Sequence, residues 1–482
     1  MPPRYRRVAV IGAGPSGLAA THALATEKAF DTIRVFDRRD RVGGLWHYDA
    51  EPDVFPTTTG VPTDQTRKPP ASVTELPAFA PASLPDPRAR SALYWGLDSN
   101  VGAESMAFTH TPFPVVNSPV SIERYGHSNP SRPYGVITNW IEDLFRPYLP
   151  LVTLRTTVES VEKRGKEWVL TLRRAGELYR GRPHDYWWTE SFDAVIVASG
   201  HYHVPFLPAI PGLIETSKQL PGRFEHSKSY RKPDKYADKR VLIVGGNVSA
   251  ADLIQDLHAI VQGPLEVAVR GRNPLLDSVY HLPNVQLHPT VHSISVSSAD
   301  PAKVDAVFDD GTRATGLDHV LFATGYRLQY PFLKPNPTTP ENRVAGFYQH
   351  VFHTDDPSLT LIGQVKAGLS FRVYEYQAVA VARYYAGRNA QPLPDTNEQR
   401  AWEQDRLKTH GPTSGFHAIG PDFAPYFNWF VDFAGPAAVG TESYALPRWD
   451  DTWATKGLAL LGLKDKYWKG LIERGQAIKA KL

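Results

Sequence analysis

The pattern of apolar and polar positions at the start of the chain predicts a buried strand followed by a helix. Residues 8–11 are four consecutive apolar residues, and an alanine-rich stretch begins at residue 18. A short uninterrupted apolar run is typical of a parallel strand that is covered on both faces. A second run of this kind, residues 33–36, follows the predicted helix. The order strand, helix, strand predicts an α/β unit.

Three glycines lie between the first predicted strand and the first predicted helix. Gly12, Gly14 and Gly17 fit the pattern G-x-G-x-x-G. The first glycine allows a tight turn, the second lets the backbone approach a pyrophosphate, and the third lets the helix pack on the strand. Asp37 ends the second strand, where a carboxylate accepts a hydrogen bond from a ribose 2′-hydroxyl. The pattern predicts a dinucleotide site, and the alternative is a glycine-rich turn that binds no ligand.

The same arrangement returns later in the chain. Residues 193–201 and 318–326 each contain an acidic residue, an apolar strand and a turn of Ala, a hydroxyl residue, Gly and an aromatic ring. The second copy follows its own glycine-rich turn, which begins at Gly245 after the apolar residues 241–244. The predicted fold class is therefore α/β, with two Rossmann-like dinucleotide-binding domains, the smaller one inserted in the larger.

The residue that ends the second strand of each unit distinguishes the two nucleotides. This residue is Asp37 in the first unit and Arg270 in the second, with Arg272 just beyond. A carboxylate suits a ribose hydroxyl, whereas arginine suits a 2′-phosphate. We therefore expect FAD in the first unit and NADPH in the second; the alternative for the arginines is a pair of solvated surface residues. The expected boundaries are residues 1–204 and 328–482 for the FAD domain, with a helical C-terminal tail, and residues 205–327 for the NADPH domain.

The second glycine turn departs from the pattern at two positions. Asn247 stands where the second glycine is expected, and Ala250 stands where the third is expected. Asparagine tolerates left-handed dihedral angles better than most residues, and alanine is a mild change where a helix packs on a strand. The Asn247 side chain either crowds the pyrophosphate or hydrogen-bonds it. The departure thus concerns NADPH binding in the second unit and leaves the FAD expectation unchanged.

Composition excludes several other kinds of protein. With 482 residues the chain has room for two or three domains, and its net charge of +3 implies no nucleic-acid or membrane-surface partner. The chain has no cysteine, which excludes disulfides, thiolate zinc sites and C-x-x-C redox centres. Since no uninterrupted apolar run reaches about 18 residues, we expect no membrane span.

Two short segments invite other interpretations. His201-Tyr202-His203 is better explained by a turn than by a metal site, and no cluster with metal-ligand spacing accompanies it. The C-terminal Ala480-Lys481-Leu482 differs by one residue from the peroxisomal signal Ser-Lys-Leu. We expect a cytoplasmic protein, with a peroxisomal location as the alternative.

The middle of the chain adds further elements. Residues 51–91 contain many prolines and predict a long surface excursion, because proline disfavours helix interiors and central strands. A helix is expected over residues 137–146, and strands are expected over residues 151–154, 157–161 and 168–172.

The segment between the two units carries a family resemblance. Residues 220–230 resemble the fingerprint F-x-G-x-x-x-H-x-x-x-(F/Y) of flavin-containing monooxygenases, with Leu220 in place of Phe. The two glycine turns, Gly43-Gly44-Leu45-Trp46 and Ala323-Thr324-Gly325-Tyr326 support it. The resemblance, to the soluble fungal or yeast type of the family, runs from about residue 6 to about residue 388.

The resemblance implies a reaction. NADPH reduces FAD, the reduced flavin captures O₂ as a C4a-hydroperoxide, and a soft sulfur or nitrogen nucleophile takes the distal oxygen. The segment from Tyr94 through Asn100 to Met106 is similar to the family segment whose Asn faces the flavin, so Asn100 is the candidate catalytic residue. An uncharged amide donates a hydrogen bond to a peroxide without protonating it. The alternative role for Asn100 is that of a loop cap.

The glycine patterns and the resemblance together assign the cofactor-binding residues. Those expected to bind FAD are Gly12, Gly14, Pro15, Ser16, Gly17, Asp37, Gly44, Leu45, Trp46, Met106, Val158, Ser199 and Gly200. Those expected to bind NADPH are His226, Tyr230, Gly245, Asn247, Ser249, Arg270, Arg272, Thr324, Gly325 and Tyr326. No residue is assigned to a metal.

Other functions remain open at this point. A Baeyer–Villiger monooxygenase would use the same cofactors on a ketone, but its fingerprint ends in Trp-Pro or Trp-Asp where Tyr230-Arg231 stands. An uncoupled NADPH oxidase or a redox sensor would keep both nucleotide sites.

The expected partners are O₂ and a small nucleophilic substrate, with neither nucleic acid nor a membrane, and a homodimer is one alternative for the oligomeric state. The tail aromatics Trp402, Phe416, Tyr426, Phe427, Trp429 and Phe430 are either a substrate wall or ordinary core residues.

Overall fold

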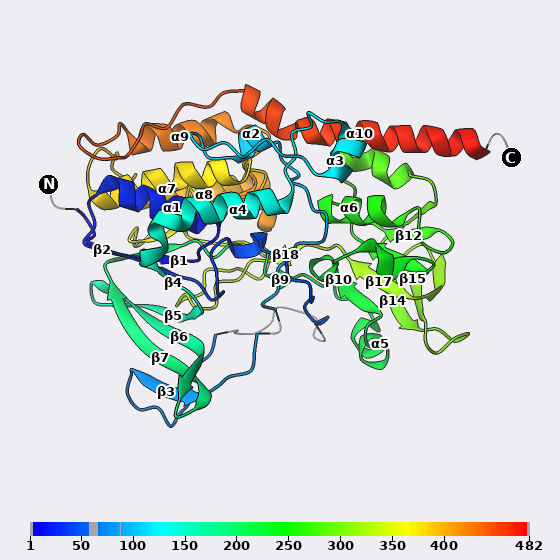
Figure 1. Cartoon of the computed structure of the whole chain (residues 1–482), viewed down its shortest axis with the longest axis horizontal. Helices are drawn as coiled ribbons and strands as arrows, with labels where there is room; N and C mark the ends of the chain where they lie inside the picture. The colour runs from blue at the N-terminus through cyan, green and yellow to red at the C-terminus, as the bar shows by residue number, and fades with distance from the viewer. Residues whose placement is uncertain (1–2, 57–65, 87, 480–482) are drawn as a thin grey trace.

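The computed structural model describes residues 3–56, 66–86 and 88–479, so Ala480-Lys481-Leu482 lies outside the described residues. Two α/β bodies lie side by side, and the last helix, α10 (Thr452–Lys479), runs along one edge of both (Figure 1). In the described part of the chain, no helix combines the length and apolar character needed to cross a bilayer.

The larger body is built on a seven-stranded sheet. Its strand order is β19 (Phe347–Tyr348), β20 (Phe352–His353), β21 (Leu359–Leu361), β8 (Ala194–Val197), β1 (Arg7–Ile11), β2 (Thr32–Phe36) and β4 (Val152–Thr153). The strands from β21 to β4 are parallel, and Val8 of β1 pairs with Ile33 on one side and Ala194 on the other. The predicted parallel strands of the first unit are confirmed.

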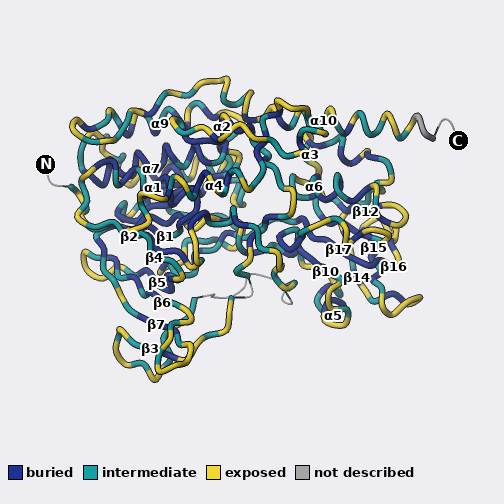
Figure 2. Tube along the Cα trace, in the orientation of Figure 1, coloured by how far each residue is buried: buried dark blue, intermediate teal, exposed yellow. Residues whose placement is uncertain are grey.

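Alternate residues of β1 face two different layers, as the two-residue period of a strand requires. Val8 and Val10 belong to the core beneath the helices α1 (Pro15–Glu27), α4 (Tyr134–Phe145) and α7 (Phe371–Ala386). Ala9 and Ile11 belong to the core beneath an antiparallel sheet of β3 (Ala78–Pro81), β7 (Arg182–Phe192), β6 (Glu167–Tyr179) and β5 (Thr156–Arg164). Strand β1 is thus buried from Val8 to Ile11 in the middle of the larger body (Figure 2).

The smaller body repeats this layering. Its five strands are all parallel, in the order β10 (Phe224–His226), β17 (His319–Phe322), β11 (Val241–Val244), β12 (Leu265–Ala268) and β13 (Val285–His288). Helix α6 (Val248–Leu257) packs on one face of this sheet together with α10. The antiparallel strands β14 (Val291–Val296), β15 (Val304–Phe308) and β16 (Arg313–Leu317) cover the other face.

The smaller body is inserted in the larger one, as the sequence predicts. The seven-stranded sheet takes strands from both sides of the segment that forms the five-stranded sheet. The chain passes between the bodies at an antiparallel pair, β9 (Val204–Pro205) and β18 (Tyr326–Arg327). The remaining helical elements are η1 (Gly44–Trp46), α2 (Ala103–Met106), α3 (Pro119–Tyr125), η2 (Arg146–Leu151), α5 (Leu213–Gln219), η3 (Ser227–Ser229), η4 (Pro233–Tyr236), η5 (Pro274–His281), α8 (Thr396–His410), η6 (Ser414–His417) and α9 (Ala424–Ala434).

The proline-rich excursion is more structured than the sequence predicts. It contributes β3, which pairs with β7 at the edge of the antiparallel sheet, a position that tolerates the proline at its end. The excursion also reaches the smaller body, because the buried Lys228 forms an ion pair with Asp53 and donates to the Arg88 carbonyl at 2.8 Å. Arg231 donates to the carbonyls of Asp49, just before the excursion, and Ser91, at its end, at 2.6 and 3.0 Å.

The tail aromatics divide into two groups. Phe416, Phe427 and Phe430 are buried, the last two in the core beneath α7, as ordinary core residues. Trp402 and Trp429 instead line a cleft of about 450 Å³ between α8 and α9, together with Tyr426.

The first glycine turn allows a direct test of the fold. A Cβ atom at Gly17 would lie 1.9 Å from the Gly12 carbonyl oxygen. We expect Gly17→Ala to lower the free energy of unfolding by about 3 kcal/mol, because α1 must move away from β1. Urea denaturation measures this change.

The matched control is Gly135→Ala. This glycine lies in α4, where a Cβ atom meets nothing within 4 Å. Alanine favours the helix there by up to about 1 kcal/mol. Equal stability of the Gly17→Ala variant and the wild type would contradict the packing described here.

Candidate functional site

The first glycine turn is shaped by close backbone contacts. Gly12 has φ of +109°, and a Cβ atom there would lie 2.5 Å from the Ala198 carbonyl oxygen. Gly14 precedes α1, and its Cα atom would lie 2.9 Å from a Cβ atom at Gly44. The loop that begins at Gly43 therefore lies directly on the turn. The structure thus brings together two segments that the sequence singled out separately.

Asp37 holds this turn in place. Its carboxylate is 8% exposed and accepts hydrogen bonds from the backbone N–H groups of Ala13, at 2.7 Å, and Arg39, at 2.8 Å. A carboxylate has about four acceptor positions, so two remain for a ribose hydroxyl. The residue predicted to bind the nucleotide also anchors the loop that approaches it.

Unpartnered polar groups gather where the central strands of the larger sheet end. His201 follows β8 and is buried, yet neither ring nitrogen has a hydrogen-bond partner among the described residues. The buried Nε2 of Gln364, which follows β21, also lacks a partner in the described structure. Buried polar groups are nearly always hydrogen-bonded, and ligands of open α/β sheets bind at the carboxyl ends of the strands. These groups fit a ligand with a polar ring edge, as the flavin of FAD has.

The remaining residues assigned to FAD fall into three groups. Ser199 and Gly200 are exposed just before His201. Leu45 and Trp46 lie in η1, which begins at Gly44; a Cβ atom at Gly44 would lie 3.9 Å from Pro15, and the Ser16 hydroxyl donates to the Ala198 carbonyl at 3.1 Å. The side chains of Met106 and Val158 are buried in the two cores that flank the sheet.

The second glycine turn matches the first in its geometry. Gly245 has φ of +142°, and a Cβ atom there would lie 2.3 Å from the Ala323 carbonyl oxygen, just as Gly12 approaches Ala198. Ala250 is fully buried where α6 packs on β11, so this helix accommodates a methyl group that α1 does not. The internal repeat thus extends to the atoms that make each turn tight.

Asn247 does not adopt the left-handed conformation that asparagine tolerates. Its φ is −134°, which is extended backbone, so no left-handed tolerance is needed. Its side chain instead caps α6, because Oδ1 accepts from the N–H of Val248 at 2.9 Å and from Asn273 Nδ2 at 3.3 Å. Asparagine is a favoured N-cap residue, which explains its presence.

The two arginines predicted to recognise a 2′-phosphate differ in their surroundings. Arg270 follows β12 and has no ion-pair partner within the described ranges. Arg272 pairs with Asp277 at 3.0 Å. The loop that carries them lies on the second turn, because Asn273 N–H donates to the Gly246 carbonyl at 3.3 Å. The Arg270 guanidinium therefore lies beside the turn without an ion-pair partner in the described residues, and it can contact a 2′-phosphate.

The other residues assigned to NADPH lie around the junction of the two bodies, apart from Ser249 and Tyr230. Ser249 begins α6, and the Thr324 hydroxyl donates to the Phe206 carbonyl beside β18, next to Gly325. The Tyr326 ring lies 5.3 Å from that of His226. Tyr230 points into the smaller body, where its hydroxyl donates to Asp256 at 3.0 Å.

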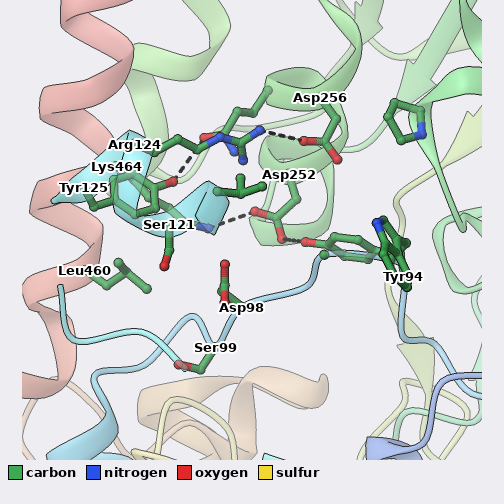
Figure 3. A pocket seen from close by; sticks show the side chains of 15 residues that line it. Tyr94, Asp98, Ser99, Ser121, Arg124, Tyr125, Asp252, Asp256, Leu460 and Lys464 are labelled. Atoms are coloured by element: carbon green, nitrogen blue, oxygen red, sulfur yellow. Dashed lines mark hydrogen bonds and ion pairs between the residues drawn. The ribbon is translucent and has the colours of Figure 1, made fainter. Parts of the chain in front are cut away.

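Asn100 is held by the C-terminal helix, a contact that the sequence did not predict. Its Oδ1 accepts from Lys464 Nζ at 2.6 Å, and Lys464 also contacts Asp252 Oδ1 at 2.9 Å. Asp252 and Lys464 line a cavity of about 190 Å³ with Tyr94, Asp98 and Arg124 (Figure 3). No local signal marks Lys464, which is one of many charged residues in the tail.

No group of three or more His, Cys, Asp or Glu side chains in the described residues is arranged to hold a metal ion. His201 contributes to no such group.

Buried histidines predict the acid sensitivity of the protein. Burial lowers the pKa of His201 from 6.5 to about 4. The unfolded chain then binds more protons than the folded chain between these pH values, so stability falls as the pH falls from about 6.5 to about 4, by up to about 1.4 kcal/mol per pH unit.

We expect His201→Asn to reduce the slope of the free energy of unfolding against pH in this range, by an amount equivalent to about one proton. Urea denaturation at saturating FAD measures the slope. The exposed His292 supplies the control variant His292→Asn, and equal slopes for both variants would contradict the assignment.

Comparison with known proteins places the chain in a family. Residues 88–273 and 270–435 match the family described as flavin-binding monooxygenase-like, and residues 10–66 match an NAD(P)-binding Rossmann-like domain. The family match extends beyond residue 388, where the resemblance was expected to end. The flavin-containing monooxygenase ustF2 of Aspergillus flavus is 26% identical over 93% of this chain and 96% of its own. The flavin-containing monooxygenase FMO GS-OX1 of Arabidopsis thaliana is 30% identical over 89% of this chain and 84% of its own.

Solved structures share the fold. The S-allyl-L-cysteine S-oxygenase of Allium sativum superimposes with a TM-score of 0.69 at 24% identity, covering 99% of both chains. An open structure of cyclohexanone monooxygenase superimposes with a TM-score of 0.54 at 14% identity, covering 89% of this chain and 97% of the other. With its two equivalent glycine turns and its family match, the chain belongs to the flavin-containing monooxygenase family and is an FAD-dependent monooxygenase that uses NADPH.

Proposed function

We propose that this monooxygenase oxygenates a soft sulfur or nitrogen atom of a small molecule, with FAD bound to the larger body and NADPH bound to the smaller. The observation that carries the proposal is the chemical difference between two turns of equal geometry. The first turn has the buried Asp37 beside it, and the second has Arg270 without an ion-pair partner in the described structure. When bound, reduced FAD supplies the chemistry that activates O₂.

The residues of the larger body would hold FAD by shape and polarity. Gly14 and Gly44 leave room for the pyrophosphate, and Asp37 accepts from the ribose. His201 and Gln364 would satisfy their unpartnered nitrogens on the polar edge of the flavin. Because burial holds the pKa of His201 at about 4, its ring is neutral and adds no cation beside the flavin at neutral pH.

Asn100 would donate a hydrogen bond from its amide to the oxygen that bound FAD activates. An amide N–H donates without releasing its proton, so the oxygen is stabilised rather than expelled. Selectivity for sulfur or nitrogen is supported by Tyr230 and Arg231, which stand where the Baeyer–Villiger fingerprint has Trp followed by Pro or Asp. The name of the similar Allium protein, an S-oxygenase, points the same way.

Rapid mixing tests the proposed function. The FAD-loaded protein is reduced with NADPH without oxygen and then mixed with O₂, alone or with a thioether, an amine or a ketone. We expect the absorbance of the oxygenated flavin to decay faster with the thioether or the amine, and the S- or N-oxide to form. Faster decay with the ketone alone would establish a Baeyer–Villiger reaction, and unaccelerated decay with H₂O₂ as the product would establish an oxidase.

Nucleotide selectivity tests the role of Arg270. Loss of one charge-assisted contact to the 2′-phosphate costs about 1.5–3 kcal/mol, so Arg270→Gln should reduce the preference for NADPH over NADH about 10- to 100-fold. The ratio of kcat/KM for flavin reduction by the two nucleotides measures the change. Arg313→Gln, at an exposed arginine of β16 in the same body, is the control and should leave the ratio unchanged. An unchanged ratio in Arg270→Gln would show that Arg270 does not recognise the phosphate.

A further inference from the structure

Helix α10 is bonded to both bodies. On the larger body, Gly102 N–H donates to the Gly457 carbonyl at 2.9 Å. On the smaller body, Trp468 Nε1 donates to Gln255 of α6 at 2.7 Å. The helix is therefore placed by contacts on each side of the junction, and the residues between these contacts have fixed neighbours.

Lys464 lies between these two attachments. It is 8% exposed, and its ammonium group donates to Oδ1 of Asn100 at 2.6 Å and to Oδ1 of Asp252 at 2.9 Å. The other oxygen of Asp252 accepts from the Tyr94 hydroxyl at 2.9 Å. Figure 3 shows Lys464 and Tyr94 approaching the Asp252 carboxylate from opposite sides. Both ends of the segment from Tyr94 to Asn100 are thus tied to one carboxylate of α6.

We infer that Lys464 is a positioning residue that fixes the orientation of the Asn100 amide. The inference rests on the proposed function, in which the Asn100 amide donates to oxygen. An ammonium group can only donate, so the amide must present its oxygen to Lys464. The NH₂ group is then directed away from Lys464 and can donate to another acceptor.

This bond matters because the two ends of an amide are nearly equal in shape. A free Asn100 side chain would flip and present a carbonyl oxygen, which only accepts hydrogen bonds and repels the lone pairs of another oxygen, as readily as its NH₂ group. A charge-assisted bond is roughly twice as strong as a neutral one and selects a single orientation. Asp252 balances the buried charge of Lys464, which would otherwise be costly to bury.

Because Asp252 belongs to α6, the orientation of Asn100 depends on the smaller body. Helix α6 begins at the Asn247 turn, where NADPH is proposed to bind. The Lys464 contact therefore links the amide proposed to face the flavin with the helix proposed to face the nucleotide phosphates.

The test compares Lys464→Met with a matched control. Lys469→Met removes an exposed lysine one turn further along α10, whose partner is Asp465 at 2.7 Å. With a thioether substrate, we expect Lys464→Met to raise the fraction of oxidised NADPH that is recovered as H₂O₂ about tenfold, because one charge-assisted bond is lost. Lys469→Met should leave this fraction unchanged. The dissociation constants of FAD and NADP⁺ should stay within about twofold of wild type in both variants.

Two readouts separate positioning from a purely structural role. In the double variant with Asn100→Ala, Lys464→Met should produce no further rise in H₂O₂, because it acts through the amide that is already gone. The visible spectrum of the bound oxidised flavin, which does not depend on turnover, should shift in the same direction in Lys464→Met as in Asn100→Ala. Additive effects in the double variant, or an unshifted spectrum, would overturn the inference.

The outcomes distinguish this inference from the proposed function. If Asn100→Ala raises the H₂O₂ fraction and Lys464→Met does not, the inference fails and the proposed function stands. If the wild type yields no oxygenated product from any nucleophile, the proposed function fails. The inference about Lys464 is then tested only by comparing the flavin spectra of the variants. If Lys464→Met does not retain FAD, Asp252→Asn replaces it. This variant should also shift the spectrum, because it removes the charge that holds Lys464, and an unshifted spectrum would overturn the inference.

Discussion

The whole architecture depends on the close approach of backbone atoms at two glycine turns. At Gly12 and Gly245 the chain passes so near to the carbonyl of a neighbouring strand that a Cβ atom would lie within 2.5 Å of it. This contact sets the start of the following helix at the carboxyl edge of its sheet, where a helix N-terminus attracts an anion. Because the turns are equivalent, each body offers the same place to a dinucleotide, and the charges around the turn decide which one is bound.

The two sites serve one reaction only when the bodies are held together. The antiparallel pair of β9 and β18 is the covalent junction. Three further segments cross this junction. They are the proline-rich excursion, which Lys228 and Arg231 hold, then the segment that carries Asn100, and finally helix α10. The amide proposed to face the flavin therefore lies where the bodies meet, at the point where reduction by the nucleotide and activation of oxygen must be coordinated.

The sequence predicted what local patterns encode. The glycine spacing, the apolar strands and Asp37 gave the correct fold class and the insertion of one domain in the other, because strand burial and tight turns leave short, regular signatures. The capping role of Asn247 was not predicted, because the comparison with the first turn drew attention to the missing glycine rather than to the start of α6. Lys464 was missed altogether, because its partners, Asn100 and Asp252, are far from it in the chain and only the folded structure brings them together.

Isotope labelling tests the central claim most directly. The protein is supplied with FAD, NADPH, ¹⁸O₂ and a thioether, and the product is analysed by mass spectrometry. A monooxygenase of a soft nucleophile should give a sulfoxide that contains one ¹⁸O atom for each NADPH oxidised, with little H₂O₂. NADPH consumption that yields only labelled H₂O₂, or a sulfoxide without the label, would contradict the account.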